Sequence, residues 1–340
     1  MSVTIKDVAK LAGVSASTVS LVINQKSNVR YKTRKRVEDA IAQLNFHPRR
    51  NARGLASRMT KNIGFVLTED HFSRAEPFYT KVFLGTEFEA RKHEYYILLT
   101  TVQAKFNPNE QFPRFLLEKN VDGVILAGTV PQKLIDYIDR LNLPVVLIDY
   151  LISSPKASTI LTNNYHGGRI AVEHLIDYGH RQIGFVGGDI NHPSIGDRLR
   201  GYRDALQAAS IPADHALIST AEPSTAVDDG YNATRRLNQT GRGFTAIFAV
   251  NDIMAVGAMR CLHEAGRKVP EDVSIIGFDD IEVCLHVQPH LSTVRVFKEE
   301  LGAIAVRRLV ENIQTKRNMV SQVVVQVELV IRDSTRKLNP

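Results

Sequence analysis

From residue 62 to about residue 280, short apolar runs alternate with stretches that have the spacing of amphipathic helices. The apolar runs are rich in β-branched residues and occupy 63–67, 95–99, 123–127, 145–149, 183–187, 246–250 and 273–277. Helical stretches such as HGGRIAVEHLIDYG and DIMAVGAMRCLHEAG lie between them and end on glycine. This alternation is typical of parallel sheets with helices on both faces. Because roughly 280 residues exceed one core of ordinary size, we predict two doubly wound α/β lobes.

The first 48 residues carry no strand pattern and predict three short helices with tight connections. Thr4 and Asp7 have the spacing of a capping box, and Gly13 is expected to end the first helix. Ser15 is expected to cap the second helix, and the third is expected from about Lys32 to Leu44. The predicted inner faces are Val8, Leu11 and Ala12, then Val19, Val22 and Ile23, then Val37, Ile41 and Leu44. Three basic residues of the third helix are expected to point outward, namely Arg34, Lys35 and Arg36.

The charge is distributed unevenly along the chain. Residues 1–61 hold 13 Lys and Arg against 3 Asp and Glu, whereas the remaining residues hold 30 against 33. This segregation favours a polyanion as the partner of the first sixty residues. The predicted helix, turn and second helix also match a helix-turn-helix, whose second helix enters the major groove of DNA. In that second helix Ser17, Thr18 and Ser20 can bond to phosphates or bases.

Polar residues directly follow several predicted strands, at the edge where ligands bind to open α/β sheets. These residues are Asp149, Asn251, Asp252 and Asp279. Arg198 begins a predicted helix, and an arginine with two or three acids offers paired donors and acceptors that match adjacent sugar hydroxyls. The apolar faces of a sugar ring can be covered by Phe78, Tyr79 and Phe278.

Structural alternatives exist for some of these polar residues. Asp252 can equally well cap the helix that it begins, and Arg198 with Asp279 can form a purely structural ion pair. Asp280 is expected to face away from the ligand.

Targeting and catalytic motifs are missing from the sequence. The N-terminal MSVTIKDVAK is not a signal peptide, and no stretch approaches the ~20 apolar residues that span a bilayer. Cys261 and Cys284 are too few for a disulfide framework or a zinc site. No phosphate loop, G-x-S-x-G or H-E-x-x-H motif occurs. We therefore expect a cytoplasmic protein that is not an enzyme and uses no metal and no cofactor.

Several ordered blocks of the sequence resemble the LacI/GalR family of bacterial transcription regulators. The N-terminal blocks are TIKDVAKLAGVSASTVSLVIN at 4–24, TRKRVEDAIAQLNFHP at 33–48 and NARGLAS at 51–57. The later blocks are EHLIDYGHRQIGFVGG, DRLRGYRDAL, AVNDIMAVGAM, VSIIGFDD and LSTV, in the family's order and spacing. The resemblance implies a helix-turn-helix headpiece and a core similar to type I periplasmic binding proteins.

The resemblance also implies roles in DNA binding. Ala16 and Ser17 occupy the variable positions that face bases, while phosphate contact or helix docking is implied for Thr4, Thr18, Asn24 and Thr33. The stretch from about Arg50 to Ser57 matches a hinge that becomes helical on operator DNA, with Arg53, Leu55 and Ala56 at the DNA. Leu55 matches a leucine that wedges into a base step from the minor groove and thereby bends the duplex.

Leu21 departs from the family pattern, which has arginine at this position. An arginine there can pair with guanine through two hydrogen bonds, whereas the methyl groups of leucine can only contact a thymine methyl. We therefore expect an A·T pair, or no preference, where relatives demand G·C. The alternative is that Leu21 turns inward and packs on the headpiece core.

The resemblance divides the chain into a headpiece at 1–48, a hinge helix and linker at 49–61, and an effector-binding and dimerisation core at 62–340. The N-lobe is expected at about 62–160 and 292–322, and the C-lobe at about 161–291 and 323–340. Arg198, Asp279, Phe78 and either Asn251 or Asp252 match effector-site residues of relatives.

The function implied is that of a ligand-responsive regulator, in the first place a repressor, which binds double-stranded operator DNA as a homodimer. The expected effector is a sugar or sugar derivative bound between the lobes, although a purine or nucleoside also fits an Arg/Asp/Phe site. A periplasmic-type sugar-binding protein would share both lobes, but it would have a signal peptide and no basic headpiece. No heptad tail follows VELVIRDST, so a coiled-coil tetramer is not expected.

Overall fold

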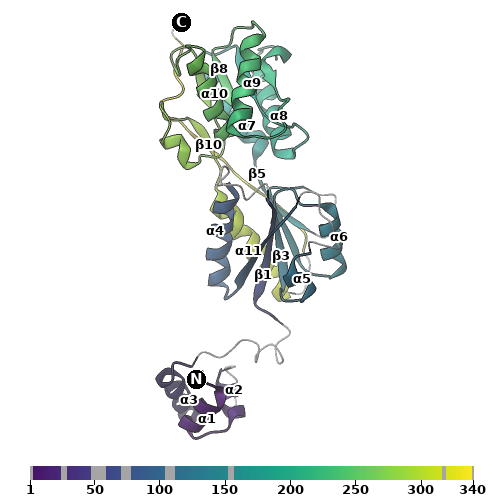
Figure 1. The fold of residues 1–340 in the computed structure, drawn as a ribbon, viewed down its shortest axis with the longest axis vertical. Helices are drawn as coiled ribbons and strands as arrows, with labels where there is room; N and C mark the ends of the chain where they lie inside the picture. Colours follow the sequence, from purple (N-terminus) through teal and green to yellow (C-terminus); the bar gives the residue numbers. More distant parts are fainter. Residues whose placement is uncertain are drawn as a thin grey trace. The chain divides into compact units, whose positions relative to one another are not determined.

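The computed structural model describes residues 3–23, 29–46, 59–69, 78–103, 112–151, 157–315 and 319–338. The chain forms two compact units, residues 1–60 and residues 61–340 (Figure 1). The first unit contains the headpiece and the second contains the α/β core. Within the described residues, no helix is both long and apolar enough to cross a membrane.

The headpiece has the three helices that the sequence predicts, α1 (Ile5–Ala12), α2 (Ala16–Ile23) and α3 (Tyr31–Gln43). The capping box is present, because the Asp7 carboxylate accepts hydrogen bonds from the Thr4 backbone N–H (2.8 Å) and hydroxyl (2.6 Å). These bonds lower the pKa of Asp7. Gly13 ends α1 with φ 63°, a conformation that costs glycine little.

The headpiece core differs from the predicted inner faces at several positions. Its buried residues are Val8, Ala9, Ala12, Val19, Val22, Val37, Ala40 and Phe46. The prediction for Leu11 is wrong, since this side chain is 46% exposed and Ala9 is buried instead. On a helix of 3.6 residues per turn, Ala12 lies between Val8 and Ala9, and Leu11 falls outside that stripe. Ile41 and Leu44 are only partly buried and Arg34 is half-buried rather than exposed.

The N-lobe is built on a six-stranded parallel sheet in the order β11-β5-β4-β3-β1-β2. Its strands are β1 (Asn62–Thr68), β2 (Tyr96–Val102), β3 (Gly123–Ala127), β4 (Val145–Ile148), β5 (Ser158–Thr162) and β11 (Gln322–Val325). Its helices are α4 (Phe78–Lys92), α5 (Arg114–Leu117), α6 (Gln132–Arg140) and α11 (Lys298–Thr315). Helices α4 and α11 lie on one face of the sheet, and α5 and α6 lie on the other (Figure 1).

The C-lobe is built on a four-stranded parallel sheet in the order β7-β6-β8-β9. Its strands are β6 (Ile183–Val186), β7 (Ile218–Ser219), β8 (Ala246–Ala249) and β9 (Ser274–Ile276). Its helices are α7 (Asn164–Asp177), α8 (Pro193–Ala208), α9 (Val227–Gln239) and α10 (Asp252–Glu264). Two 3₁₀ turns, His215–Leu217 and Glu282–Leu285, complete it. The seven apolar runs of the sequence all contain strands of these two sheets.

The chain crosses between the lobes through a two-stranded antiparallel pair, β10 (Thr293–Arg295) and β12 (Glu328–Val330). The segment that includes β10 also bridges to the C-lobe, through Ile276 with Ser292 and Asp279 with Arg295. Strand β11 instead pairs with β5 of the N-lobe. The link from β5 to α7 is a further connection between the two lobes.

Candidate DNA-binding and effector sites

The N-terminus of α2 carries a cluster of hydroxyl groups. The Ser15 hydroxyl accepts from the Thr18 backbone N–H (3.2 Å) and thus caps the helix as predicted. It also lies 2.8 Å from the Ser17 hydroxyl and 2.9 Å from the Thr18 hydroxyl. Ser17 is exposed, while Thr18 and Ser20 are half-buried. This end of α2 therefore presents small hydrogen-bonding groups that allow close approach of another surface.

The two apolar candidates of α2 lie in different environments. Ala16 packs partly against the headpiece core, although the sequence suggests that it faces bases. Leu21 is half-buried, and within the described headpiece it is not one of the apolar residues that pack on this core. On the other elements, Thr4 is exposed and engaged by Asp7, and Thr33 in α3 is half-buried.

The remaining DNA-binding candidates lie outside the described residues. These are Asn24, Arg53, Leu55 and Ala56, together with the whole predicted hinge from Arg50 to Ser57. The roles that the resemblance implies for them stay predictions.

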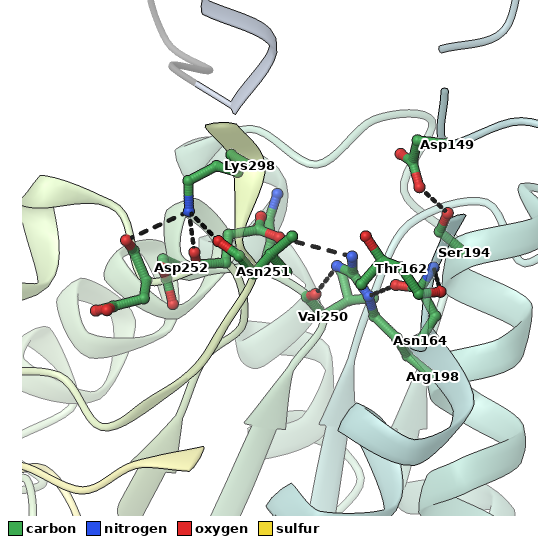
Figure 2. Close-up of polar contacts among 12 residues, drawn as sticks. Asp149, Thr162, Asn164, Ser194, Arg198, Val250, Asn251, Asp252 and Lys298 are labelled. Atoms are coloured by element: carbon green, nitrogen blue, oxygen red, sulfur yellow. Dashed lines mark hydrogen bonds and ion pairs between the residues drawn. The ribbon is translucent and has the colours of Figure 1, made fainter. Parts of the chain in front are cut away.

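Arg198 of α8 lies at the carboxyl ends of the C-lobe strands and makes four directed contacts, of which Figure 2 shows polar ones. Its Nε donates to Asn164 Oδ1 (2.8 Å), and its Nη1 donates to the Val250 carbonyl (2.6 Å). Its Nη2 lies 3.6 Å from Asp279 Oδ1, and its guanidinium carbon lies 3.6 Å from the centroid of the Phe278 ring. Because protein groups contact the guanidinium from several sides, it is held in a fixed orientation.

Asp149 follows β4 and joins residues of both lobes. Its Oδ2 accepts from the Tyr79 hydroxyl (3.2 Å), and its Oδ1 accepts from the Ser194 hydroxyl of α8 (3.1 Å). The Phe78 and Tyr79 rings are in edge-to-face contact, with centroids 5.0 Å apart. Sequence reasoning missed Ser194 and Asn164. Their only signals are that Asn164 begins the helix after β5 and that Ser194 precedes Arg198 by one helical turn.

Asn251 and Asp252 have separate roles at the start of α10. Asn251 Oδ1 caps the helix by accepting from the Met254 backbone N–H (2.8 Å), so the cap that the sequence suggests for Asp252 belongs to Asn251. Asp252 is fully buried, and its carboxylate accepts from Thr293 Oγ1 (2.5 Å) and the Ile281 backbone N–H (2.9 Å). Burial raises the pKa of Asp252 to about 6, against the effect of these hydrogen bonds. These contacts tie α10 to the segments at Ile281 and Thr293 and are structural.

Asp149 and Asp279 share an unusual backbone conformation. Their φ angles are 58° and 108°, in the left-handed region that non-glycine residues rarely adopt. Such conformations cost about 1–3 kcal/mol each and tend to cluster at functional sites. Both residues are among those that the sequence places at the ligand.

The Asp280 carboxylate forms ion pairs with two arginines that are not among the candidate effector-site residues. It pairs with Arg295 (2.7 Å) and Arg332 (2.6 Å). Burial by itself would raise the pKa of Asp280, but the hydrogen bonds from Arg332 and Arg295 bring it below its usual range.

The combined geometry suits non-covalent recognition of a polar ligand. A fixed arginine, two carboxylates, two hydroxyls and the Phe78 ring come from α4, β4, α8 and the segment after β9. The prediction that Phe278 covers a sugar ring is wrong, because this side chain is fully buried and the Arg198 guanidinium lies over its ring. Among the described residues, no group of three or more His, Cys, Asp or Glu side chains is arranged to hold a metal ion. Together the fold and these residues define a class of protein, in which a helix-turn-helix headpiece is joined to a two-lobed ligand-binding core.

Comparisons with known proteins identify the family. A family model described as "Bacterial regulatory proteins, lacI family" matches residues 4–49, and one described as "Periplasmic binding protein-like domain" matches residues 172–335. The chain is 34% identical to the HTH-type transcriptional repressor PurR of Aliivibrio salmonicida, over 98% of this chain and 99% of that protein. It is 34% identical to the ribose operon repressor of Haemophilus influenzae, with the same coverage. The chain therefore belongs to the LacI family of bacterial regulatory proteins.

Solved structures agree with this assignment. A complex of the transcriptional regulator CelR with cellobiose has a TM-score of 0.75 and 32% identity, over 98% of this chain and 99% of that one. A lac repressor dimer bound to operator and the anti-inducer ONPF has a TM-score of 0.81 and 29% identity, over 99% and 100%. The named relatives are transcriptional repressors rather than enzymes.

Proposed function

We propose that this chain is a transcriptional repressor whose affinity for operator DNA is controlled by a small polar effector, most simply a sugar. The observation that carries the proposal is the Arg198 set, in which the guanidinium is held between Asn164, Asp279 and the Phe278 ring. The guanidinium donates and the neighbouring carboxylates accept, and this pairing matches adjacent sugar hydroxyls, each of which can accept and donate. The relatives named for ribose and cellobiose support this choice.

In this proposal the headpiece binds DNA as part of a homodimer. The basic charge of residues 1–61 supplies attraction to phosphates, and α2 supplies contacts to bases. Two headpieces on one dimer match the two half-sites of a pseudo-palindromic operator, and their linkage raises the effective concentration of the second. The dimer and operator in the lac repressor structure support this arrangement. We further propose that the protein acts in the cytoplasm, where bacterial DNA lies.

The effector site is tested by a thermal-shift screen of the full chain against D-ribose, cellobiose, sugar phosphates and nucleosides. We expect at least one neutral sugar to raise the melting temperature. Arg198→Ala should abolish this shift, because it removes the donor group around which the site is arranged. The matched control is Arg200→Ala on the same helix, since Arg200 is exposed and pairs only with Asp197 and the Tyr165 ring in the contacts described. A shift that persists in Arg198→Ala would refute the proposed anchor.

A nucleoside is the second candidate effector. The aromatic ring of Phe78 can stack on a base as well as on a sugar, and Asp149 or Asp279 can accept from base N–H groups. The same screen separates the two candidates. If a nucleoside raises the melting temperature and no sugar does, the effector in the proposal becomes a nucleoside. The proposed role as a repressor is unchanged by that result.

A further inference from the structure

Two consecutive aspartates after β9 belong to two different sets of contacts. The Asp279 carboxylate lies at Arg198 in the proposed effector site (3.6 Å). The Asp280 carboxylate binds Arg295 and Arg332, and these arginines lie at the end of β10 and just after β12. Because β10 and β12 lie in the segments that connect the lobes, this dipeptide joins the proposed ligand site to the interlobe crossing.

The backbone of this dipeptide needs support from its surroundings. Asp279 and Asp280 have φ angles of 108° and 52°, so two successive non-glycine residues are in the left-handed region. Such a conformation persists only where neighbouring groups hold it. From the C-lobe side, Asp252 of α10 accepts from the Ile281 N–H (2.9 Å), and the Asp279 N–H donates to the Val294 carbonyl (2.8 Å).

The other support is Lys298, the first residue of α11. Its ammonium donates to the carbonyl oxygens of Asp279, of Asp280 (3.4 Å) and of Val296 (3.3 Å), as Figure 2 shows for the group around Lys298. Lys298 is 9% exposed, and a buried ammonium is costly unless its donors are satisfied. In the contacts described, these donors are satisfied by backbone carbonyls.

Helix α11 belongs to the N-lobe, where it packs against α4 and against strands β3, β4 and β5. The Asp279–Asp280 dipeptide belongs to the C-lobe, because it directly follows the β9 region. The ammonium of Lys298 therefore connects an N-lobe helix to the C-lobe segment that carries an effector-site carboxylate. Removing it would leave the two strained residues held from the C-lobe and the crossing strands only.

We propose that Lys298 is a positioning residue, which fixes the Asp279 carboxylate relative to the N-lobe and thereby couples effector binding to the arrangement of the lobes. This inference rests on the proposed function, since it takes the Arg198–Asp279 set as the effector site. A ligand that changes the Arg198–Asp279 contact would move the dipeptide against the Lys298 ammonium and against the two crossing strands. The coupling then needs no contact between Lys298 and the ligand.

The test compares the full chain with Lys298→Met, which keeps the length of the side chain and removes its donors. The probes are D-ribose and cellobiose in calorimetric titrations, and a DNA duplex selected by the wild-type chain from a random library. We expect Lys298→Met to lose at least tenfold in affinity for the sugar that the wild type binds. The sugar should also change the DNA affinity of Lys298→Met much less than it changes that of the wild type. Lys298→Arg, which keeps charged donors, should restore part of both effects.

A ligand-free readout accompanies these titrations. Hydrogen exchange of the peptide containing residues 278–282 should become faster in Lys298→Met, because the carbonyl clamp on this segment is lost. Lys81→Met is the matched control. Lys81 lies on α4 and pairs with Glu299 of α11 (3.5 Å), so its loss touches the same two helices and spares the dipeptide. We expect this control to behave as the wild type in all three measurements.

The outcomes separate this inference from the proposed function. A lysine with a merely structural role would lower the melting temperature of Lys298→Met while sugar affinity and coupling stayed within twofold, and that result overturns the proposal. Unchanged exchange at 278–282 also overturns it. If Lys298→Met does not fold, Lys298→Gln takes its place and is held to the same criteria. Failure of the proposed function instead appears in the wild type itself, which would then bind neither a sugar nor a selected duplex.

Discussion

At the scale of single residues, Leu21 is the side chain of α2 from which we predict a change in base recognition. The hydroxyls of Ser15, Ser17 and Thr18 bond to one another at the start of the helix, and they carry no charge. Leu21 lies one turn further along and is half-buried. A leucine can favour a thymine methyl but offers no donor to guanine, so α2 contains no side chain able to make the bidentate contact with guanine.

Replacing Leu21 by arginine should therefore create a guanine preference. In selection of binding sites from random DNA, we expect Leu21→Arg to enrich G·C at one position per half-site where the wild type enriches A·T or nothing. The expected gain in discrimination is about 1–3 kcal/mol, the usual range for a bidentate contact with a base.

Leu11→Arg is the control for the added charge, because Leu11 is an exposed residue on α1. It should raise affinity for all sequences alike and leave the preferred bases unchanged. If the wild type already selects guanine at that position, and Leu21→Arg selects the same sites, the assignment of Leu21 to base contact is wrong.

The proposed effector site was only partly predictable from single residues. Arg198, Asp149 and Asp279 were found because acids after strands and an arginine at a helix start are visible in the sequence. Asn164 and Ser194 were missed because nothing local marks them, and their contacts join residues 34 and 45 positions apart. The cap that the sequence allows for Asp252 is made by Asn251, since helix-cap geometry decides which of the two adjacent side chains faces the first turn.

At the scale of elements, helices α4 and α11 can cross closely because each has a glycine where it meets the other. A Cβ atom on Gly85 would lie 2.0 Å from the Glu299 carbonyl oxygen, and one on Gly302 would lie 2.1 Å from the Val82 carbonyl oxygen. Each helix therefore packs directly against the backbone of the other. This close packing also fixes the start of α11, where Lys298 lies.

Gly85→Ala should force these helices apart. Because the clashing atom is backbone and cannot rotate away, we expect a loss of about 1–3 kcal/mol in the free energy of unfolding, the usual cost of overpacking. Urea denaturation followed by circular dichroism measures it.

Gly243→Ala is the control for adding a methyl group. Its Cβ would lie 3.4 Å from the flexible side chain of Gln182, which can shift. We expect this variant to stay within about 0.5 kcal/mol of the wild type, as is usual for substitutions without a specific clash. Equal effects of the two variants would contradict the helix-crossing argument.

The strands that the sequence predicts differ in residue pattern from those that it does not. The seven runs that the sequence marks contain strands that are largely apolar, and most of them are buried on both faces. The strands outside these runs are β5, β7, β10, β11 and β12. Three of them, β7, β10 and β12, have only two or three residues, and the other two carry serine, threonine or alternating exposed residues, as in STILT and QVVV. Their pairing is set by distant partners, so the local pattern is weak.

At the scale of the whole molecule, buried ionisable groups join segments that are far apart in the chain. His180 binds Thr245 (2.9 Å) and Ser274 (3.0 Å) through its two ring nitrogens, and it also contacts the Arg336 carbonyl. Burial lowers the pKa of His180. Asp252 connects α10 to the crossing segment at Thr293, and burial raises its pKa to about 6.

These two groups should make opposite contributions to the pH dependence of stability. The unfolded chain binds more protons than the native protein at His180, so this residue stabilises the fold above about pH 6.5 and that stability is lost as the pH falls. At Asp252 the native protein binds more protons, so its contribution becomes less favourable as the pH rises from about 4 to 6. The pH dependence of the wild-type free energy of unfolding includes both contributions.

Single variants should therefore change the slope in opposite directions. Between pH 5 and 6.5, the free energy of unfolding from urea titrations should rise less steeply with pH in His180→Gln than in the wild type, because its positive contribution is removed. In Asp252→Asn it should rise more steeply, because a negative contribution is removed. His263→Gln is the control on α10, since His263 is exposed. Slopes that change in the same direction in the two test variants would show that these groups do not govern the acid response of the fold.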